Sequence, residues 1–244
     1  MRLLDRLLRR LSARRNERPD LEAWRRRHLP ALAREVARVL PHVPERGAAI
    51  VDVGANLGEF TAQLLKARPD ARAWLFEPVH DLYERCRDRF ADNPRVVVEP
   101  FALAHENGSA TIWKARHNPG GNSLVYDLMF DRRDVAEVTE KTVHDEERIE
   151  HRVFSEYARE KGIEHVDLIK TDTEGFDYRV LEGMLAFLQS CHPLPVILSE
   201  LMEERYHPFW QDQLAVVQHL YALGYAEVDL SRMKKIDDIL FVPA

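Results

Sequence analysis

Short apolar runs alternate with amphipathic stretches along most of the chain. The runs are rich in valine, isoleucine and leucine and end at glycine, proline or acidic residues, which is typical of buried strands. This alternation predicts an α/β fold: a mostly parallel sheet with an antiparallel closing strand and helices on both faces. The expected strands are 49–53, 73–77, 95–99, 166–171 and 195–199, with closing strands near 225–230 and 237–242, and the expected helices are 59–67, 80–91, 176–189 and 208–223.

Two more helices are expected before the first strand, over about 2–13 and 20–40. Residues 1–46 hold 13 arginines against 6 acids, and the first helix interleaves arginines with leucines at helical spacing. Such a helix can lie on an anionic membrane surface, or it can pack on the domain or on a second subunit of a homo-oligomer. We favour packing, because a short amphipathic helix more often covers a core. The expected organisation is a basic N-terminal helical extension, 1–47, and one domain, 48–244.

The segment from about 102 to 164 interrupts the alternation and is expected to be an insertion in the domain. It contains two predicted strands, 109–113 and 147–153, the second followed by a short helix. Residues 118–123 are expected to form a mobile, glycine-rich turn, and the charged run 131–152 a solvated surface or a lid. Because long insertions in compact domains are usually functional, we expect this one to face a substrate.

The most informative motif follows the first expected strand. That strand carries Asp52 near its end, and the next residues read G-x-N-x-G, with Gly54, Asn56 and Gly58 leading into a helix. The glycines let a ligand lie against the main chain where the helix begins. A dinucleotide site would instead show G-x-G-x-x-G and offer amides to a pyrophosphate. An acid repels phosphate, but it suits the ammonium and sulfonium of S-adenosylmethionine.

A second acid stands at the end of the next strand. Glu77 lies about twenty residues beyond the glycine loop, where a carboxylate can accept hydrogen bonds from both ribose hydroxyls. The alternative is that Asp52 caps a helix and that Glu77 is a solvated loop residue. The residues expected to bind the cofactor are Asp52, Gly54, Ala55, Asn56, Gly58, Glu77, Pro78, Phe101 and Ala102.

Three further acids are expected at the same edge of the sheet. Asp172 and Glu174 follow the strand 166–171, and Glu200 ends the strand after it. Such acids can orient a hydroxyl, abstract its proton or bind Mg²⁺, although they can also cap helices or bond backbone amides. Lys170 lies on the same face of its strand as Asp172 and is a candidate counter-charge that would make a metal unnecessary.

These residues together resemble the FkbM-type methyltransferases. The resemblance is carried by the run Asp52–Gly58, by Glu77-Pro78, by Gly121-Asn122-Ser123, by Ile169-Lys170-Thr171-Asp172-Thr173-Glu174-Gly175-Phe176-Asp177, and by Val180-Leu181-Glu182-Gly183. It covers roughly residues 48–241 and implies a class I, Rossmann-like fold. It also implies methyl transfer from S-adenosylmethionine to a hydroxyl of a sugar, a glycan, or a glycosylated or polyketide natural product. One departure is Phe154-Ser155, where the family commonly has Leu-Asp.

An alcohol needs a base or a metal before it attacks a sulfonium-bound methyl group. The catalytic candidates are Asp172, Glu200 and His207; the substrate-binding candidates are Asn122, Ser123, Glu174, Tyr206 and Trp210; and the candidate metal ligands are Asp172, Glu174 and Glu200. The expected partner is a small-molecule or glycan acceptor. The rival functions are a Rossmann-type oxidoreductase, disfavoured by the glycine pattern, and a non-catalytic protein that binds S-adenosylmethionine.

The composition narrows the classes of function further. The chain has 244 residues and a formal net charge of −6, so its overall charge does not favour nucleic acid as a partner. Cys86 and Cys191 are too few for a disulfide framework or a cysteine metal cluster. No apolar run reaches the roughly 20 residues that span a bilayer, and no signal peptide is visible, so we expect a cytoplasmic location.

Overall fold

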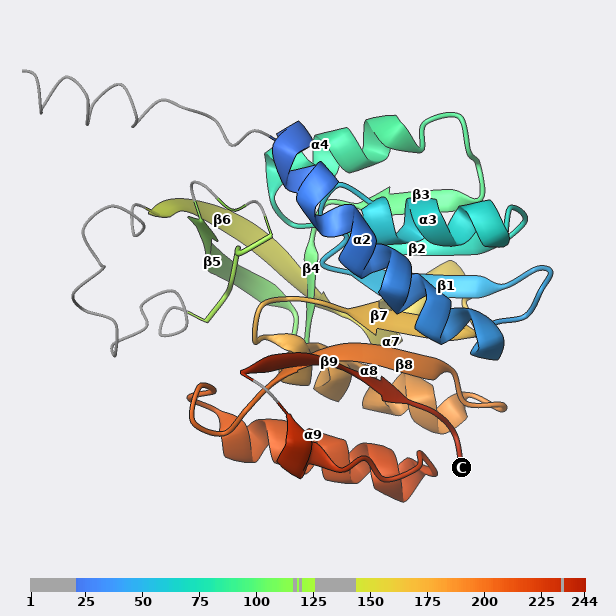
Figure 1. The fold of residues 1–244 in the computed structure, drawn as a ribbon, viewed down its shortest axis with the longest axis vertical. Coiled ribbons are helices and arrows are strands. Elements are labelled where there is room, and N and C mark those ends of the chain that lie inside the picture. Colours follow the sequence, from blue (N-terminus) through green and yellow to red (C-terminus); the bar gives the residue numbers. More distant parts are fainter. Residues whose placement is uncertain (1–20, 116–117, 119, 126–143, 234) are drawn as a thin grey trace, which may run out of the picture.

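A six-stranded sheet forms the centre of the computed structural model, which describes residues 21–115, 118, 120–125, 144–233 and 235–244 (Figure 1). The strand order is β3-β2-β1-β7-β8-β9, and only β9 is antiparallel to its neighbour. The expectation of a mostly parallel sheet with an antiparallel closing strand is therefore confirmed. The strands are β1 (Ala49–Val53), β2 (Arg72–Phe76), β3 (Val96–Glu99), β7 (Leu168–Thr171), β8 (Val196–Met202) and β9 (Ile236–Phe241).

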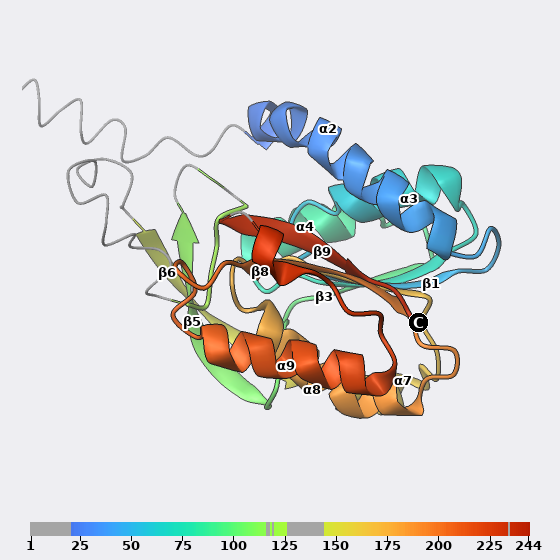
Figure 2. The same ribbon diagram turned by 60° about the horizontal axis from the view of Figure 1, so that its bottom comes forward.

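Helices cover both faces of this sheet (Figures 1 and 2). One face carries α2 (Leu21–Val39), α3 (Glu59–Ala67) and α4 (His80–Arg89), and the other carries α7 (Phe154–Lys161), α8 (Asp177–Ser190) and α9 (Trp210–Leu223). The central strands carry apolar side chains on both faces, so each helix layer buries its own apolar cluster against the sheet. This packing leaves the carboxyl edge of the parallel strands open to a ligand.

The insertion builds a second, three-stranded sheet beside that edge. It consists of β4 (Ala102–Ala104), β5 (Gly108–Ala115) and β6 (His144–Val153) in the order β4-β6-β5. The two strands expected in the insertion are confirmed, whereas β4 was missed because three residues are too few to show a periodicity. Gly183 of α8 lies so close to β4 that a Cβ there would stand 2.1 Å from the carbonyl oxygen of Ala104.

One expected strand is wrong. Within 225–230 only Tyr225 forms a β-bridge, an isolated one to Pro243 beyond β9, and the chain then enters a 3-10 turn, Leu230–Arg232. The hydroxyl of Tyr221 donates to the carbonyl of Val228 and accepts from its N–H. The Tyr221 hydroxyl thus satisfies the backbone groups of Val228 that a neighbouring strand would otherwise bond. The outer edge of β8, where this segment could have paired, is occupied by β9.

The expected second N-terminal helix is confirmed as α2, and it packs directly on the domain. Arg25 forms an ion pair with Glu59 of α3, and Arg68 donates to the carbonyls of Leu40 and Val43 just beyond α2. The domain boundary near residue 47 stays a prediction. The first helix, 2–13, with its membrane and second-subunit alternatives, lies outside the described residues, as does the part of the charged run from 131 to 143. Across the described part of the chain, no helix is both long and apolar enough to traverse a membrane.

Candidate active site

The glycine loop after β1 and the acidic loop after β7 are in direct contact. Gly54 has φ +73°, and a Cβ at this position would stand 2.0 Å from the carbonyl oxygen of Asp172. The N–H groups of Gly54 and Ala55 both donate to the carbonyl of Phe76, which ties the loop to the end of β2. A glycine is needed here for both its backbone angle and its lack of a side chain. The close approach brings the two predicted motifs to one site.

Asp52 does not face the ligand space as the sequence suggested. Its side chain is 0% exposed, and its Oδ2 accepts a hydrogen bond of 2.7 Å from Thr61 of α3. Its Oδ1 lies 3.9 Å from Nζ of Lys170, and burial raises the pKa of the carboxyl. The acid therefore holds β1, α3 and β7 together behind the loop. Side chains alternate between the two faces of a strand. The position of Asp52 in β1 therefore could not show whether a ligand or a helix would cover the face on which it lies.

Glu77 connects the glycine loop to the end of β2. One carboxylate oxygen accepts from the backbone N–H of Asn56 at 2.8 Å, and the other accepts from Val79 at 2.9 Å. Burial raises its pKa to about 7, against the effect of these two hydrogen bonds. Its side chain lines the site cavity. Each oxygen keeps a second lone pair, so the role as a ribose acceptor stays a prediction compatible with this geometry.

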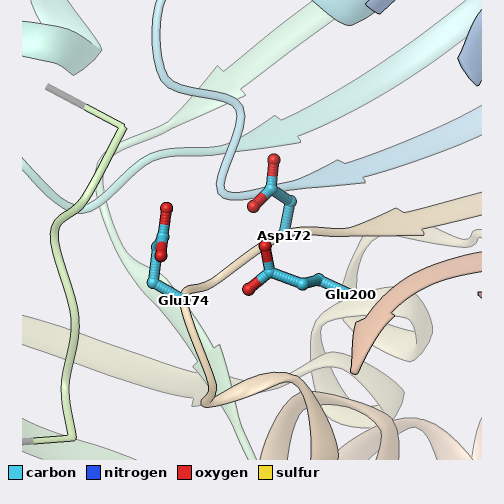
Figure 3. A group of neighbouring side chains, drawn as sticks. All are labelled: Asp172, Glu174 and Glu200. Carbon is cyan, nitrogen blue, oxygen red and sulfur yellow. The ribbon is translucent and has the colours of Figure 1, made fainter. Parts of the chain in front are cut away.

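Asp172, Glu174 and Glu200 come together as predicted, and we refer to them as the acid trio (Figure 3). One carboxylate oxygen from each lies within 4.8 Å of the others. Nζ of Lys170 donates to Asp172 at 2.9 Å, which confirms the lysine as its counter-charge. Within the described chain, Oε1 of Glu200 is buried and has no hydrogen-bond partner.

Crowding and burial favour protons on two members of the trio. Burial, with repulsion from Asp172 and Asp177, raises the pKa of Glu174 to about 8. Burial and the same neighbouring acids also raise the pKa of Glu200 well above its usual range. Glu174 adopts φ +52°, unusual for a residue with a side chain, and its carbonyl accepts a 2.7 Å hydrogen bond from Ser123. Such strain is frequent at functional sites.

The trio opens into a cavity of about 260 Å³ at the carboxyl edge of the sheet. The glycine loop, Pro78, Ala102 and the acid trio all line it. The described lining contains seven carboxylates but only one lysine or arginine: Glu35, Glu59, Glu77, Asp172, Glu174, Glu200 and Asp238, against Lys170. Glu59 is paired with Arg25 and Arg89, and burial favours protons on Glu174 and Glu200, so the net negative charge is smaller than this count. The remaining acids still favour a cationic ligand over a diphosphate.

Several cavity residues were not predicted as site residues. Trp24, His28, Ala31, Leu32 and Glu35 reach the cavity from α2, and Asp238 reaches it from β9. The five α2 positions repeat at helical spacing, which indicates only that one face of the helix is covered. Nothing in the local sequence shows that a ligand space, in place of a core, lies under that face.

Tyr206 and His207, from the loop before α9, and Trp210, the first residue of α9, do not line the cavity among the described residues. His207 is 3% exposed, its Nε2 donates to the carbonyl of Gly175, and its Nδ1 accepts from the N–H of Phe209. Burial also lowers its pKa, so this imidazole is fully engaged as a structural group. The Tyr206 ring contacts Lys235, and Trp210 lines a separate surface depression.

The remaining candidates divide between ligand space and scaffold. Asn122 lines the cavity, and its Oδ1 accepts from the N–H of Ala115. Ser123 is buried and accepts from the N–H of Val125. Phe101 packs against Phe76 with ring centroids 5.6 Å apart. Gly58 turns into α3 and, like Phe101 and Ser123, is not among the described cavity residues.

The strand order, the antiparallel edge strand and the glycine loop define a class I methyltransferase fold. Residues 52–226 match the Methyltransferase FkbM domain, and the chain belongs to this family of methyltransferases.

Two curated relatives and one solved structure show how far the similarity extends. The chain is 27% identical over 138 residues to the 2-O-methyltransferase NoeI of Sinorhizobium fredii (strain NBRC 101917 / NGR234), covering 55% of this chain and 56% of the relative. It is 27% identical over 154 residues to Methyltransferase sdnD of Sordaria araneosa, covering 55% and 60%. The chain thus matches less than two thirds of the length of each relative. Magnesium protoporphyrin IX methyltransferase (ChlM) from Synechocystis PCC 6803, solved with bound SAM, aligns at a TM-score of 0.44 and 10% identity over 88% of this chain and 77% of that one.

Proposed function

We propose that this protein transfers a methyl group from S-adenosylmethionine to a hydroxyl of a sugar, a glycan, or a glycosylated or polyketide natural product. The observation that carries the proposal is the cavity itself. A tight glycine loop and the acid trio line it together, and acidic side chains far outnumber lysine and arginine in its described lining. The family supplies the transferred group, since its members are methyltransferases.

The residues present fit S-adenosylmethionine. Gly54 and Asn56 bring main chain to the cavity, Glu77 offers free lone pairs beside them, and Pro78 and Ala102 give an apolar surface for a base. The carboxylates that line the same cavity suit an ammonium and a sulfonium. When bound, the cofactor supplies a methyl group on a positively charged sulfur. A divalent dinucleotide phosphate in the same place would face repulsion from these acids.

The trio is proposed to receive the proton of the acceptor hydroxyl. A base works best when its pKa lies near the working pH, and the pKa of Glu174, raised to about 8, meets this condition. Burial raises the pKa of Glu200 as well, and only its deprotonated form can take up the proton. Asp172 is a further candidate, although its Oδ2 accepts the hydrogen bond from Lys170. The hydroxyl proton would pass to a carboxylate as the oxygen takes the methyl group. The bond from that methyl carbon to sulfur would break, with its electron pair left on the sulfur of S-adenosylhomocysteine.

Oxygen as the receiving atom is supported by the name of one relative, a 2-O-methyltransferase. The cavity is lined by polar groups on several sides, including Asn122 and the trio, which suits an acceptor with several hydroxyls. A sugar or glycosylated compound satisfies these groups better than a purely apolar alcohol.

Binding of Mg²⁺ is the second candidate role for the acid trio. Three carboxylate oxygens within 4.8 Å of one another could share a hard cation. The ion pair between Lys170 and Asp172 already compensates one of the charges, so we favour direct proton transfer to a carboxylate.

Calorimetry and an acceptor screen test this proposal. The protein should bind S-adenosylhomocysteine and S-adenosylmethionine at micromolar concentrations and NAD⁺ much more weakly. A panel of glycans and small alcohols should then show S-adenosylhomocysteine release only with hydroxylated acceptors. Binding of NAD⁺ at least as tight as that of the adenosyl ligands would favour the oxidoreductase. Binding of the adenosyl ligands without turnover on any acceptor would favour the non-catalytic binding protein.

A further inference from the structure

Helix α2 is more than an extension packed on the domain, because one of its faces forms a wall of the cavity. Trp24, His28 and Leu32 follow one another at intervals of four residues, and Glu35 continues the same face. The helix lies beside α3 on one side of the sheet (Figures 1 and 2). It falls outside the matched family domain, which begins at residue 52. The family's domain therefore does not by itself enclose the cavity.

The two ends of this helix face are held in different surroundings. Trp24 packs against an apolar cluster that includes Leu57, Val79 and Ala102, which follow β1, β2 and β3. Its indole N–H donates to Asn118 at 3.0 Å, and its ring stacks on His28 with centroids 4.4 Å apart. This end of α2 covers the part of the cavity proposed to hold the nucleoside.

Glu35 stands at the opposite, charged end. It is half-buried, and its carboxylate interacts electrostatically with Lys170, Asp172, Asp52 and Asp238. Within the described residues, it makes no hydrogen bond or ion pair. Partial burial of a carboxylate without a close partner costs free energy, and a cationic group of a ligand in the cavity would offset this cost by binding to it.

The spacing of these two ends suits the proposed cofactor. Glu35 lies eleven positions after Trp24 in α2, which is a span of about 16 Å along the helix axis. That span is comparable with the length of a nucleoside joined through sulfur to an amino acid. An ion pair between Arg25 of α2 and Glu59 at the start of α3 holds the helix in place, and Arg89 of α4 pairs with the same Glu59.

We propose that α2 binds the methyl donor along its length, with Trp24 covering the nucleoside and Glu35 accepting a hydrogen bond from the amino-acid ammonium. This inference rests on the proposed function, and it assigns to the N-terminal helix a role that the family domain alone does not provide. It also implies that a protein trimmed to the matched domain would lose donor affinity.

Truncated ligands test the assignment atom by atom. S-adenosylhomocysteine carries the ammonium, whereas 5′-methylthioadenosine has the nucleoside and sulfur but no amino-acid group. We expect Glu35→Gln in the full chain to weaken S-adenosylhomocysteine about tenfold and to leave 5′-methylthioadenosine unchanged. Trp24→Ala should weaken both ligands by a similar factor, about fivefold. The readout is the dissociation constant from calorimetry.

The matched control is Glu22→Gln, which removes the same charge from an exposed position of the same helix. It should bind both ligands like the parent, and all variants should melt within a few degrees of it. Equal weakening of the two ligands by Glu35→Gln, no weakening at all, or an equal effect of the control would overturn the inference while leaving the proposed function intact. Failure of the parent to bind either ligand would overturn both.

Discussion

The contact between Gly54 and the Asp172 loop leads to a prediction with a built-in control. Gly54→Ala introduces a Cβ at φ +73° and 2.0 Å from the carbonyl oxygen of Asp172. Gly47→Ala introduces the same group at φ +66°, with no atom within 4 Å. The two variants share the cost of a left-handed backbone angle, about 1–2 kcal/mol. Only Gly54→Ala also has the collision.

The collision requires a movement of the loop that carries the trio. A Cβ contact below 3.0 Å is essentially never observed, so the Asp172 carbonyl must retreat by about 1 Å. Overpacking of this kind costs about 1–3 kcal/mol. We therefore expect Gly54→Ala to lower the free energy of unfolding by about 2–5 kcal/mol and Gly47→Ala by about 1–2 kcal/mol. Displacement of catalytic groups by 1 Å can reduce the rate by about 10²-fold.

Urea unfolding and initial rates of methyl transfer, measured side by side, check both parts. Gly47→Ala should keep the parental rate constant at saturating substrate, because the residue precedes β1, away from the cavity lining described here. Gly54→Ala should lose both stability and rate. If it matches Gly47→Ala in both measurements, then the two loops are not in the contact described here, and the reasoning about the site is wrong.

The remaining predictions concern individual site groups. Burial raises the pKa of Glu174 to about 8 in the folded protein, so this residue destabilises the ligand-free fold as pH rises from about 4.5 to about 8. The melting temperature of Glu174→Gln should therefore fall less between pH 5.5 and 8 than that of the parent. Glu200→Gln should slow methyl transfer by about 10²–10⁴ without weakening S-adenosylhomocysteine, and a parental rate would exclude Glu200 as the base. His207→Ala should cost about 2–4 kcal/mol of stability but leave the Michaelis constant for the acceptor unchanged, as kinetics and urea unfolding can show. Activity should survive exhaustive EDTA treatment because Lys170 supplies a counter-charge, whereas a loss restored by Mg²⁺ would support the metal instead.

The alternation of apolar runs was enough to predict the architecture. Parallel strands buried on both faces have few polar residues, and the bounds of β1 and α3 agree with the expectation to the residue. The strand expected at 225–230 failed because strand propensity does not reveal whether a sheet edge is free. The short β4 has too little sequence to carry a signal.

The site was predictable where it depends on topology and unpredictable where it depends on packing. Parallel strands end at one edge, so Asp172 and Glu200 could be brought together from sequence alone. The opposite orientation of Asp52, turned to Thr61, follows from how α3 packs on β1. The place of Glu35 in the cavity wall depends on how α2 packs beside the ends of distant strands, which no local sequence pattern encodes.

The most direct test of the central claim is to follow the methyl group itself. The protein is incubated with S-adenosylmethionine carrying a ¹³C-labelled methyl group and with the best hydroxylated acceptor, and the product is analysed by mass spectrometry and NMR. The account predicts one labelled methyl group per acceptor, bonded to oxygen, with one equivalent of S-adenosylhomocysteine formed. A label on carbon or nitrogen, or an unlabelled acceptor with S-adenosylmethionine intact, would contradict it.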